Sequence, residues 1–141
     1  MEPISQAQVG VENSGSALTQ ALGSLVLEQL ALYRRAAVAR MEKNREIARY
    51  FLLPLLNEEL LEGDFPPYSS VYFPRLTKFR GSIGFATNLV RTHGLVLAPG
   101  RYFGSPNHVR IGLGGAPKIL ETGLRILGRE LRKRASASHR L

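Results

Sequence analysis

Residues 94–115 read GLVLAPGRYFGSPNHVRIGLGG, and this stretch decides the fold. Two apolar runs flank a turn rich in glycine and proline, which is the pattern of two strands joined by a loop. In the second run, HVRIGL (108–113), apolar side chains alternate with Arg110, which therefore lies on the face opposite the core. The spacing alone leaves two interpretations of Arg110 open: an ordinary arginine on a solvated sheet face, or a cation that binds a ligand.

The sequence upstream carries apolar residues at helical spacing. They recur every three or four positions over residues 17–30, and Ser14 or Ser16 is expected to cap this helix. A second helix is expected over about 32–59. Pro54 must kink or end that helix, because proline lacks the N–H donor and its ring clashes with the preceding turn.

Further elements are predicted around the deciding stretch. A short strand is expected over 70–73, and a helix over 80–93 with Gly94 as its C-cap. A last helix opens at Pro117. Its apolar stripe consists of Ile119, Leu120, Leu124, Leu127 and Leu131. Together these elements predict an α+β fold, in which helices pack on a small sheet of about three strands and two long helices precede it.

The composition excludes several classes of protein. The chain has 141 residues, of which 44% are hydrophobic, and it contains no cysteine and only three histidines, which do not cluster. Disulfides are thereby excluded, and no metal site is expected. The net charge is +8, which we interpret mainly as a solvated helix face plus a basic tail, with nucleic-acid binding as the less favoured alternative.

The longest apolar run, YFLLPLL at 50–56, is far shorter than the ~20 residues that a membrane span needs. The first residues, MEPISQAQ, lack the basic segment of a signal peptide. We therefore expect a soluble, cytoplasmic protein that has no contact with a membrane.

Two stretches of the sequence suggest a catalytic or phosphate-binding motif, but neither fits one. GLGGAPK at 112–118 fails the spacing of a phosphate-binding loop and is better interpreted as a strand-to-helix joint. The carboxylates of residues 58–64 lie where a helix is expected to end, so a solvated helix end explains them better than an acid–base pair.

The order of elements resembles one known family. Residues 94–131 are similar to the C-terminal segment of fold-type I, pyridoxal-phosphate-dependent aminotransferases. The shared pattern is an apolar strand, Pro99-Gly100, Phe103-Gly104, a strand with the sequence Val-Arg-Ile, and a closing helix. Further upstream, residues 14–30 and 33–47 are similar to the segment that joins that family's two domains. FPPYSSVYFP at 65–74 resembles the first strand of its small domain.

The resemblance implies roles for two residues. Arg110 matches the family's arginine that binds the α-carboxylate of the substrate, and Phe103 matches a residue that lines the same site. A guanidinium suits this task, because its two parallel N–H donors match the two oxygens of a carboxylate.

The resemblance also implies pyridoxal phosphate as cofactor, but it assigns no catalytic or cofactor-binding residue to this chain. The family's Schiff-base lysine lies upstream of the segments that match. The four lysines present here are Lys43, Lys78, Lys118 and Lys133, and none lies in a segment like the family's lysine motif. Without that lysine the usual transamination route lacks its covalent link to the cofactor.

The predicted organisation is a flexible arm (1–13), an aminotransferase-like C-terminal domain (14–134) and a basic disordered tail (135–141). Within the domain, 14–60 are the connecting helices and 63–134 the small α+β domain. The sequence leaves open whether the chain is an enzyme. It is interpreted as an inactive, truncated part of an aminotransferase, as one subunit of a split aminotransferase, or as a stand-alone binding or structural module.

The apolar surface of the first two expected helices indicates which protein partners the chain should bind. In an intact aminotransferase the connecting helix and one sheet face rest on the large domain. Their exposed apolar surface here predicts either a homo-oligomer through residues 17–56 or a separate chain that carries the large domain.

Overall fold

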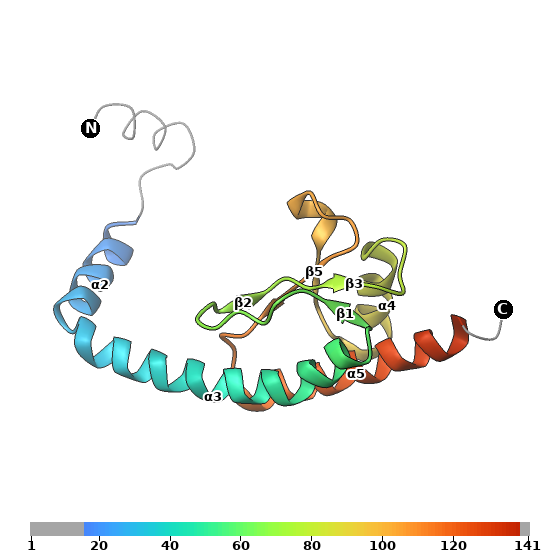
Figure 1. Cartoon of the computed structure of the whole chain (residues 1–141). Helices are drawn as coiled ribbons and strands as arrows, with labels where there is room; N and C mark the ends of the chain where they lie inside the picture. Colours follow the sequence, from blue (N-terminus) through green and yellow to red (C-terminus); the bar gives the residue numbers. More distant parts are fainter. Residues whose placement is uncertain (1–15, 139–141) are drawn as a thin grey trace. The chain divides into compact units, whose positions relative to one another are not determined.

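The computed structural model describes residues 16–138 (Figure 1). The chain divides into two compact units, Met1–Val38 and Ala39–Leu141. Among the described residues, no helix is long and apolar enough to cross a membrane.

Within residues 16–138 the helical part consists of four α-helices and a short 3-10 helix. They are α2 (Ala17–Glu28), α3 (Leu30–Asn57), α4 (Ile83–His93), η1 (Gly100–Phe103) and α5 (Pro117–Ser138). The helical spacing of apolar residues therefore predicted each long helix to within a few residues. Pro54 does not end α3, which continues to Asn57. Gly94 caps α4 in the left-handed conformation, as expected for a glycine at that position.

The strands are very short. They are β1 (Leu61–Glu62), β2 (Val71–Tyr72), β3 (Arg75–Leu76), β4 (Ala98–Pro99) and β5 (Val109–Gly112). β5 is the centre of a three-stranded antiparallel sheet in the order β2-β5-β4, and β1 pairs with β3 in a second, two-stranded sheet. The α+β prediction is thus confirmed. The first of the two strands expected within 94–115 was predicted over LVLAP (95–99), and this is wrong over residues 95–97, because only Ala98–Pro99 pair with β5.

The core lies between the sheet and the helices of the second unit. One buried cluster joins the inward side chains of α3, α4, α5 and the strands. Its α5 members are Leu120, Leu124, Leu127 and Leu131. Ile119, which the spacing placed in the same stripe, is exposed instead. Figure 1 shows α5 and the second half of α3 on one side of the strands. An ion pair joins α5 to the residue that follows α3, with Arg132 donating from Nε and Nη2 to the two carboxylate oxygens of Glu58, both at 2.8 Å.

Asn44 fixes α3 to the end of the sheet. Its side chain is fully buried, and its Nδ2 donates to the carbonyl oxygens of Leu113 at 2.6 Å and Gly115 at 2.8 Å. These bonds satisfy two backbone acceptors just after β5, where the chain leaves the sheet. The second half of α3 consequently packs as part of the core.

The division into two compact units falls within α3, after Val38. The division predicted from the sequence, into connecting helices (14–60) and a small domain (63–134), stays a prediction. The C-terminal end of the chain differs from expectation. Residues 135–138, placed in a disordered tail, continue α5, while 1–15 and 139–141 lie outside the described residues. Ser16 occupies the N-cap position of α2, but its hydroxyl makes no capping hydrogen bond.

Candidate functional site

Arg110 lies in the middle of β5 on the open face of the three-stranded sheet. The strand alternates strictly between buried and exposed residues, and Arg110 is exposed between the buried Val109 and Ile111. It pairs with Ala98 of β4. The alternation predicted from the sequence is thereby confirmed, and the charge reaches solvent without interrupting the core.

One aromatic ring contacts this cation, and two further rings adjoin the first. The guanidinium carbon of Arg110 lies 5.6 Å from the centre of the Phe103 ring, within the range of a cation–π contact. Phe103 in turn meets Phe73 edge-on, with ring centres 5.9 Å apart at 82°. The ring of His108 stacks on Phe73 at 5.0 Å and 21°. We call these four side chains the arginine–aromatic cluster.

The turn that carries Phe103 is held by backbone contacts. Gly100 donates its N–H to the carbonyl of His108 at 2.7 Å and to the hydroxyl of Ser82 at 3.1 Å, and its carbonyl accepts from the N–H of Ser105 at 2.9 Å. A side chain at Gly100 would collide with the carbonyl oxygens of Ser105 and His108, so only glycine fits here.

The start of α4 supports the same turn. The fully buried Ser82 donates its hydroxyl to the carbonyl of Pro106 at 2.9 Å, and Asn107 accepts from the N–H of Gly81 at 2.8 Å. The cluster thus rests on a framework of hydrogen bonds between two segments of the second unit.

The cluster is suited to binding a carboxylate. In residues 16–138 no salt bridge is found for Arg110, so its N–H donors remain available to a ligand. A carboxylate would form two charge-assisted hydrogen bonds, and the neighbouring rings would contact an apolar or planar ligand body.

The described residues do not fit pyridoxal phosphate by themselves. All four lysines are exposed side chains, and none belongs to β5 or to the segments that flank it in the sheet. A Schiff-base lysine is activated by a desolvated or charged pocket, which an exposed position does not provide. No group of residues able to hold a metal ion is found in the described part of the chain.

Two of the four residues of the arginine–aromatic cluster were predicted as site residues from the sequence. Arg110 and Phe103 were predicted from the family resemblance, and the structure brings them into contact. Alternation along the strand put His108 on the same face as Arg110, without assigning it a role. Phe73 was missed, because its place beside Arg110 depends on the pairing of Tyr72 with Ile111, which is not a local property of the sequence.

Comparison with known proteins agrees with the resemblance read from the sequence. The chain is 29% identical over 116 residues to the aromatic aminotransferase ISS1 of Arabidopsis thaliana, covering 82% of this chain and 28% of that protein. No family model matches the chain.

Solved structures show the same fold. A PLP-dependent aminotransferase from Streptococcus suis superposes with a TM-score of 0.78 at 21% identity, over 91% of this chain and 33% of that one. The PLP-dependent cyclase OrfR gives a TM-score of 0.76 at 23% identity, over 92% and 35%. The resemblance to the small-domain part of such enzymes is thus confirmed, and the chain spans about a third or less of the length of these relatives.

Proposed function

We propose that this chain supplies the carboxylate-binding part of an aminotransferase, an enzyme that transfers an amino group between an amino acid and a 2-oxo acid. The observation that carries the proposal is the exposed Arg110 on the open sheet face, in contact with the Phe103 ring. The likeness of the fold to PLP-dependent aminotransferases supports it.

The cluster favours a carboxylate over other anions for geometric reasons. The planar guanidinium presents parallel N–H donors at a spacing that matches two carboxylate oxygens. Packing against the ring of Phe103 restricts the side chain before a ligand arrives, so less rotamer freedom is lost on binding.

The isolated chain is proposed to be inactive. Pyridoxal phosphate withdraws electrons from a bound amino acid, and this chemistry requires a lysine in the site that the described residues do not provide. We propose that a lysine-bearing polypeptide supplies it, and that the present chain contributes the carboxylate clamp.

A binding experiment tests the first half of this proposal. Titrating the protein with 3-phenylpropanoate, followed by amide NMR shifts of the β5 residues, is expected to give saturable shifts, while uncharged 3-phenylpropanamide gives none. Arg110→Gln should weaken the binding by about tenfold or more, since a hydrogen bond to a charged group contributes roughly 1.5–3 kcal/mol. Arg110→Lys should retain only part of the affinity, because an ammonium group cannot form the two parallel hydrogen bonds of a guanidinium.

Arg101→Gln is the matched control, because Arg101 is an exposed arginine in the same turn that does not belong to the cluster. An equal loss of affinity in Arg101→Gln and Arg110→Gln would indicate a diffuse electrostatic effect and contradict a site at Arg110.

A second assay tests the need for another polypeptide. The purified chain, mixed with pyridoxal phosphate, phenylalanine and 2-oxoglutarate, should form glutamate no faster than the same mixture without protein. Turnover by the chain alone would show that it holds a complete active site and contradict the proposed division.

A further inference from the structure

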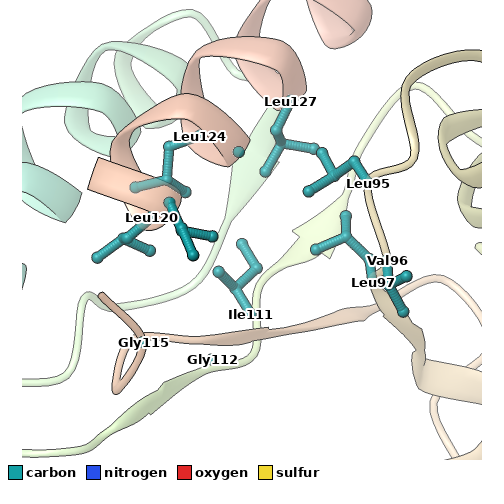
Figure 2. Close-up of a pocket in the computed structure, with 11 residues that line it drawn as sticks. Leu95, Val96, Leu97, Ile111, Gly112, Gly115, Leu120, Leu124 and Leu127 are labelled. Atoms are coloured by element: carbon teal, nitrogen blue, oxygen red, sulfur yellow. The ribbon is translucent and has the colours of Figure 1, made fainter. Parts of the chain in front are cut away.

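A second surface of the molecule, separate from the arginine–aromatic cluster, is an apolar groove beside the first turns of α5. Figure 2 shows its deeper part, where Leu120, Leu124 and Leu127 of α5 face Leu95 and Ile111 across an open space. This cavity has a volume of about 170 Å³, and an adjoining hollow of about 400 Å³ shares Leu95, Ile119 and Gly123 with it. We call the two together the α5 groove.

The groove is uncovered at its rim. Val96 and Ile119 are 76% and 74% exposed, although both are large apolar residues beside a cavity lined by apolar side chains and glycines. Gly115 adds no bulk, since the space where its Cβ would lie is empty. Exposed apolar surface of this kind next to a cavity is typical of a docking site for another apolar segment.

Helix α2 presents a matching apolar stripe. Leu18, Leu22, Leu25 and Val26 lie within about 100° of the helix circumference at the spacing i, i+4, i+7 and i+8. This is the spacing by which an amphipathic helix anchors itself in an apolar groove. None of the residues of α2 is buried, and Leu22 is 54% exposed.

The charges of the two surfaces are complementary. Glu28 is the only ionisable residue of α2 and lies at its C-terminal end, while Lys118 lies at the rim of the α5 groove. Within residues 16–138 neither forms a salt bridge. A helix docked in the groove with Glu28 beside Lys118 would pair both charges.

We propose that α2 of a second copy of this chain occupies the α5 groove, and that the exchange is reciprocal. Each copy carries both halves of the contact, so a two-fold axis satisfies two helices and two grooves at once and closes the dimer. The inference does not depend on the aminotransferase function, because neither surface includes a residue of the arginine–aromatic cluster.

Sedimentation equilibrium over a concentration series tests the association. The full chain is expected to reach twice the mass of one chain at high concentration. Leu22→Glu should raise the dissociation constant at least about tenfold, because burial of a leucine contributes roughly 1.5–3 kcal/mol and the symmetric dimer loses two. Leu27→Glu is the matched control: Leu27 is 68% exposed on the same helix but lies about 140° from Leu22, so the dimer should persist.

The groove is tested separately with the double variant Val96→Asp/Ile119→Asp. Both side chains are exposed, so the folded chain should tolerate the changes, which circular dichroism and thermal unfolding will verify. This variant should also be monomeric at concentrations where the unaltered chain is dimeric.

Mixing the two monomeric variants gives the decisive measurement. The Leu22→Glu chain keeps an intact groove, and the Val96→Asp/Ile119→Asp chain keeps an intact helix. Their mixture should therefore form a heterodimer through one of the two contacts, more weakly than the unaltered dimer but more tightly than either variant alone. The reciprocal charge exchange, Glu28→Lys with Lys118→Glu in one chain, should restore association that each single change weakens.

Three outcomes would overturn the proposal. The first is a monomeric mass for the unaltered chain at all concentrations, which would leave α2 to another partner. The second is a dimer that Leu22→Glu disrupts but the groove variant does not, which would indicate direct pairing of α2 helices. The third is a mixture of the two variants that stays monomeric.

Discussion

Helices α2 and α5 share a helical spacing of apolar residues but have very different surroundings. Both carry leucines at helical spacing, yet the leucines at 120, 124, 127 and 131 in α5 are buried while every residue of α2 is exposed. Periodicity therefore predicts that a helix forms and which face needs cover, but it does not say which molecule provides that cover. For α5 the cover is the sheet of the same chain, and for α2 we propose a second copy.

The largest expected effect tests this difference directly. Leu127→Ala should lower the free energy of unfolding by about 2–5 kcal/mol, because it opens a cavity in a close-packed core. Leu22→Ala, at a concentration low enough to keep the chain monomeric, should change it by less than about 0.5 kcal/mol. Urea denaturation followed by circular dichroism measures both. Equal losses would mean that α2 folds as part of the same core.

Two neighbouring residues of α3, one buried and one exposed, should also differ in their contribution to stability. Asn44→Ala should cost about 1–3 kcal/mol, since it leaves the carbonyls of Leu113 and Gly115 without their buried donor. The neighbouring Lys43→Ala serves as control, because Lys43 is exposed on the same helix and alanine is a good helix former. Should both variants unfold at the same urea concentration, the Asn44 contacts would not contribute to stability.

Glycines within the helices provide a third test. Gly128→Ala in α5 should stabilise the chain by about 0.5–1 kcal/mol through helix propensity, because the new Cβ would lie at ordinary contact distances, 3.5 Å from Arg132 Nη1 and 3.7 Å from Leu55 Cδ2. Gly23→Ala in α2 should raise the helical signal at 222 nm without moving the global transition, because a helix with few buried contacts unfolds locally. A shift of the global midpoint by Gly23→Ala would show that α2 is coupled to the core.

The smallest effect concerns the ion pair between Glu58, which follows α3, and Arg132 of α5. Hydrogen bonds from Arg132 lower the pKa of Glu58 below its ordinary value of 4.5 in the folded chain. A lowered carboxyl pKa stabilises the folded state above the ordinary value, and this contribution is lost as the pH falls through the folded value. Both side chains are partly exposed, so the contribution is about 0.2–1 kcal/mol.

Glu58→Gln should therefore reduce stability at pH 7 by that amount. The reduction should become smaller toward pH 2, because the carboxyl then takes up its proton in the folded state as well. Thermal unfolding at the two pH values measures the difference. If Glu58→Gln and the unaltered chain differ in stability by the same amount at both pH values, the effect comes from packing and not from charge.

The helices were predictable because their signal is local. Spacing, proline and glycine placed α4 and α5, and alternation along HVRIGL placed Arg110 on the open face. The two-residue strands β1 and β3 were missed, since each depends on pairing with segments distant in the sequence. Asn44 gave no sign of its burial, because nothing in a helical sequence shows that a polar residue will meet two free carbonyls. The choice of Arg110 and Phe103 as residues of one site came from family resemblance and not from spacing.

The glycine at position 100 has a consequence for how any ligand of Arg110 would bind. Its backbone is fixed by three hydrogen bonds within the chain, so the loop that carries Phe103 loses its conformational freedom when the chain folds. Ordering a loop costs roughly 1–2 kcal/mol of free energy for each residue. Here this cost opposes folding of the chain and does not weaken ligand binding. The surface is preorganised, so binding of a small acid should follow rigid-body behaviour with a fast association rate.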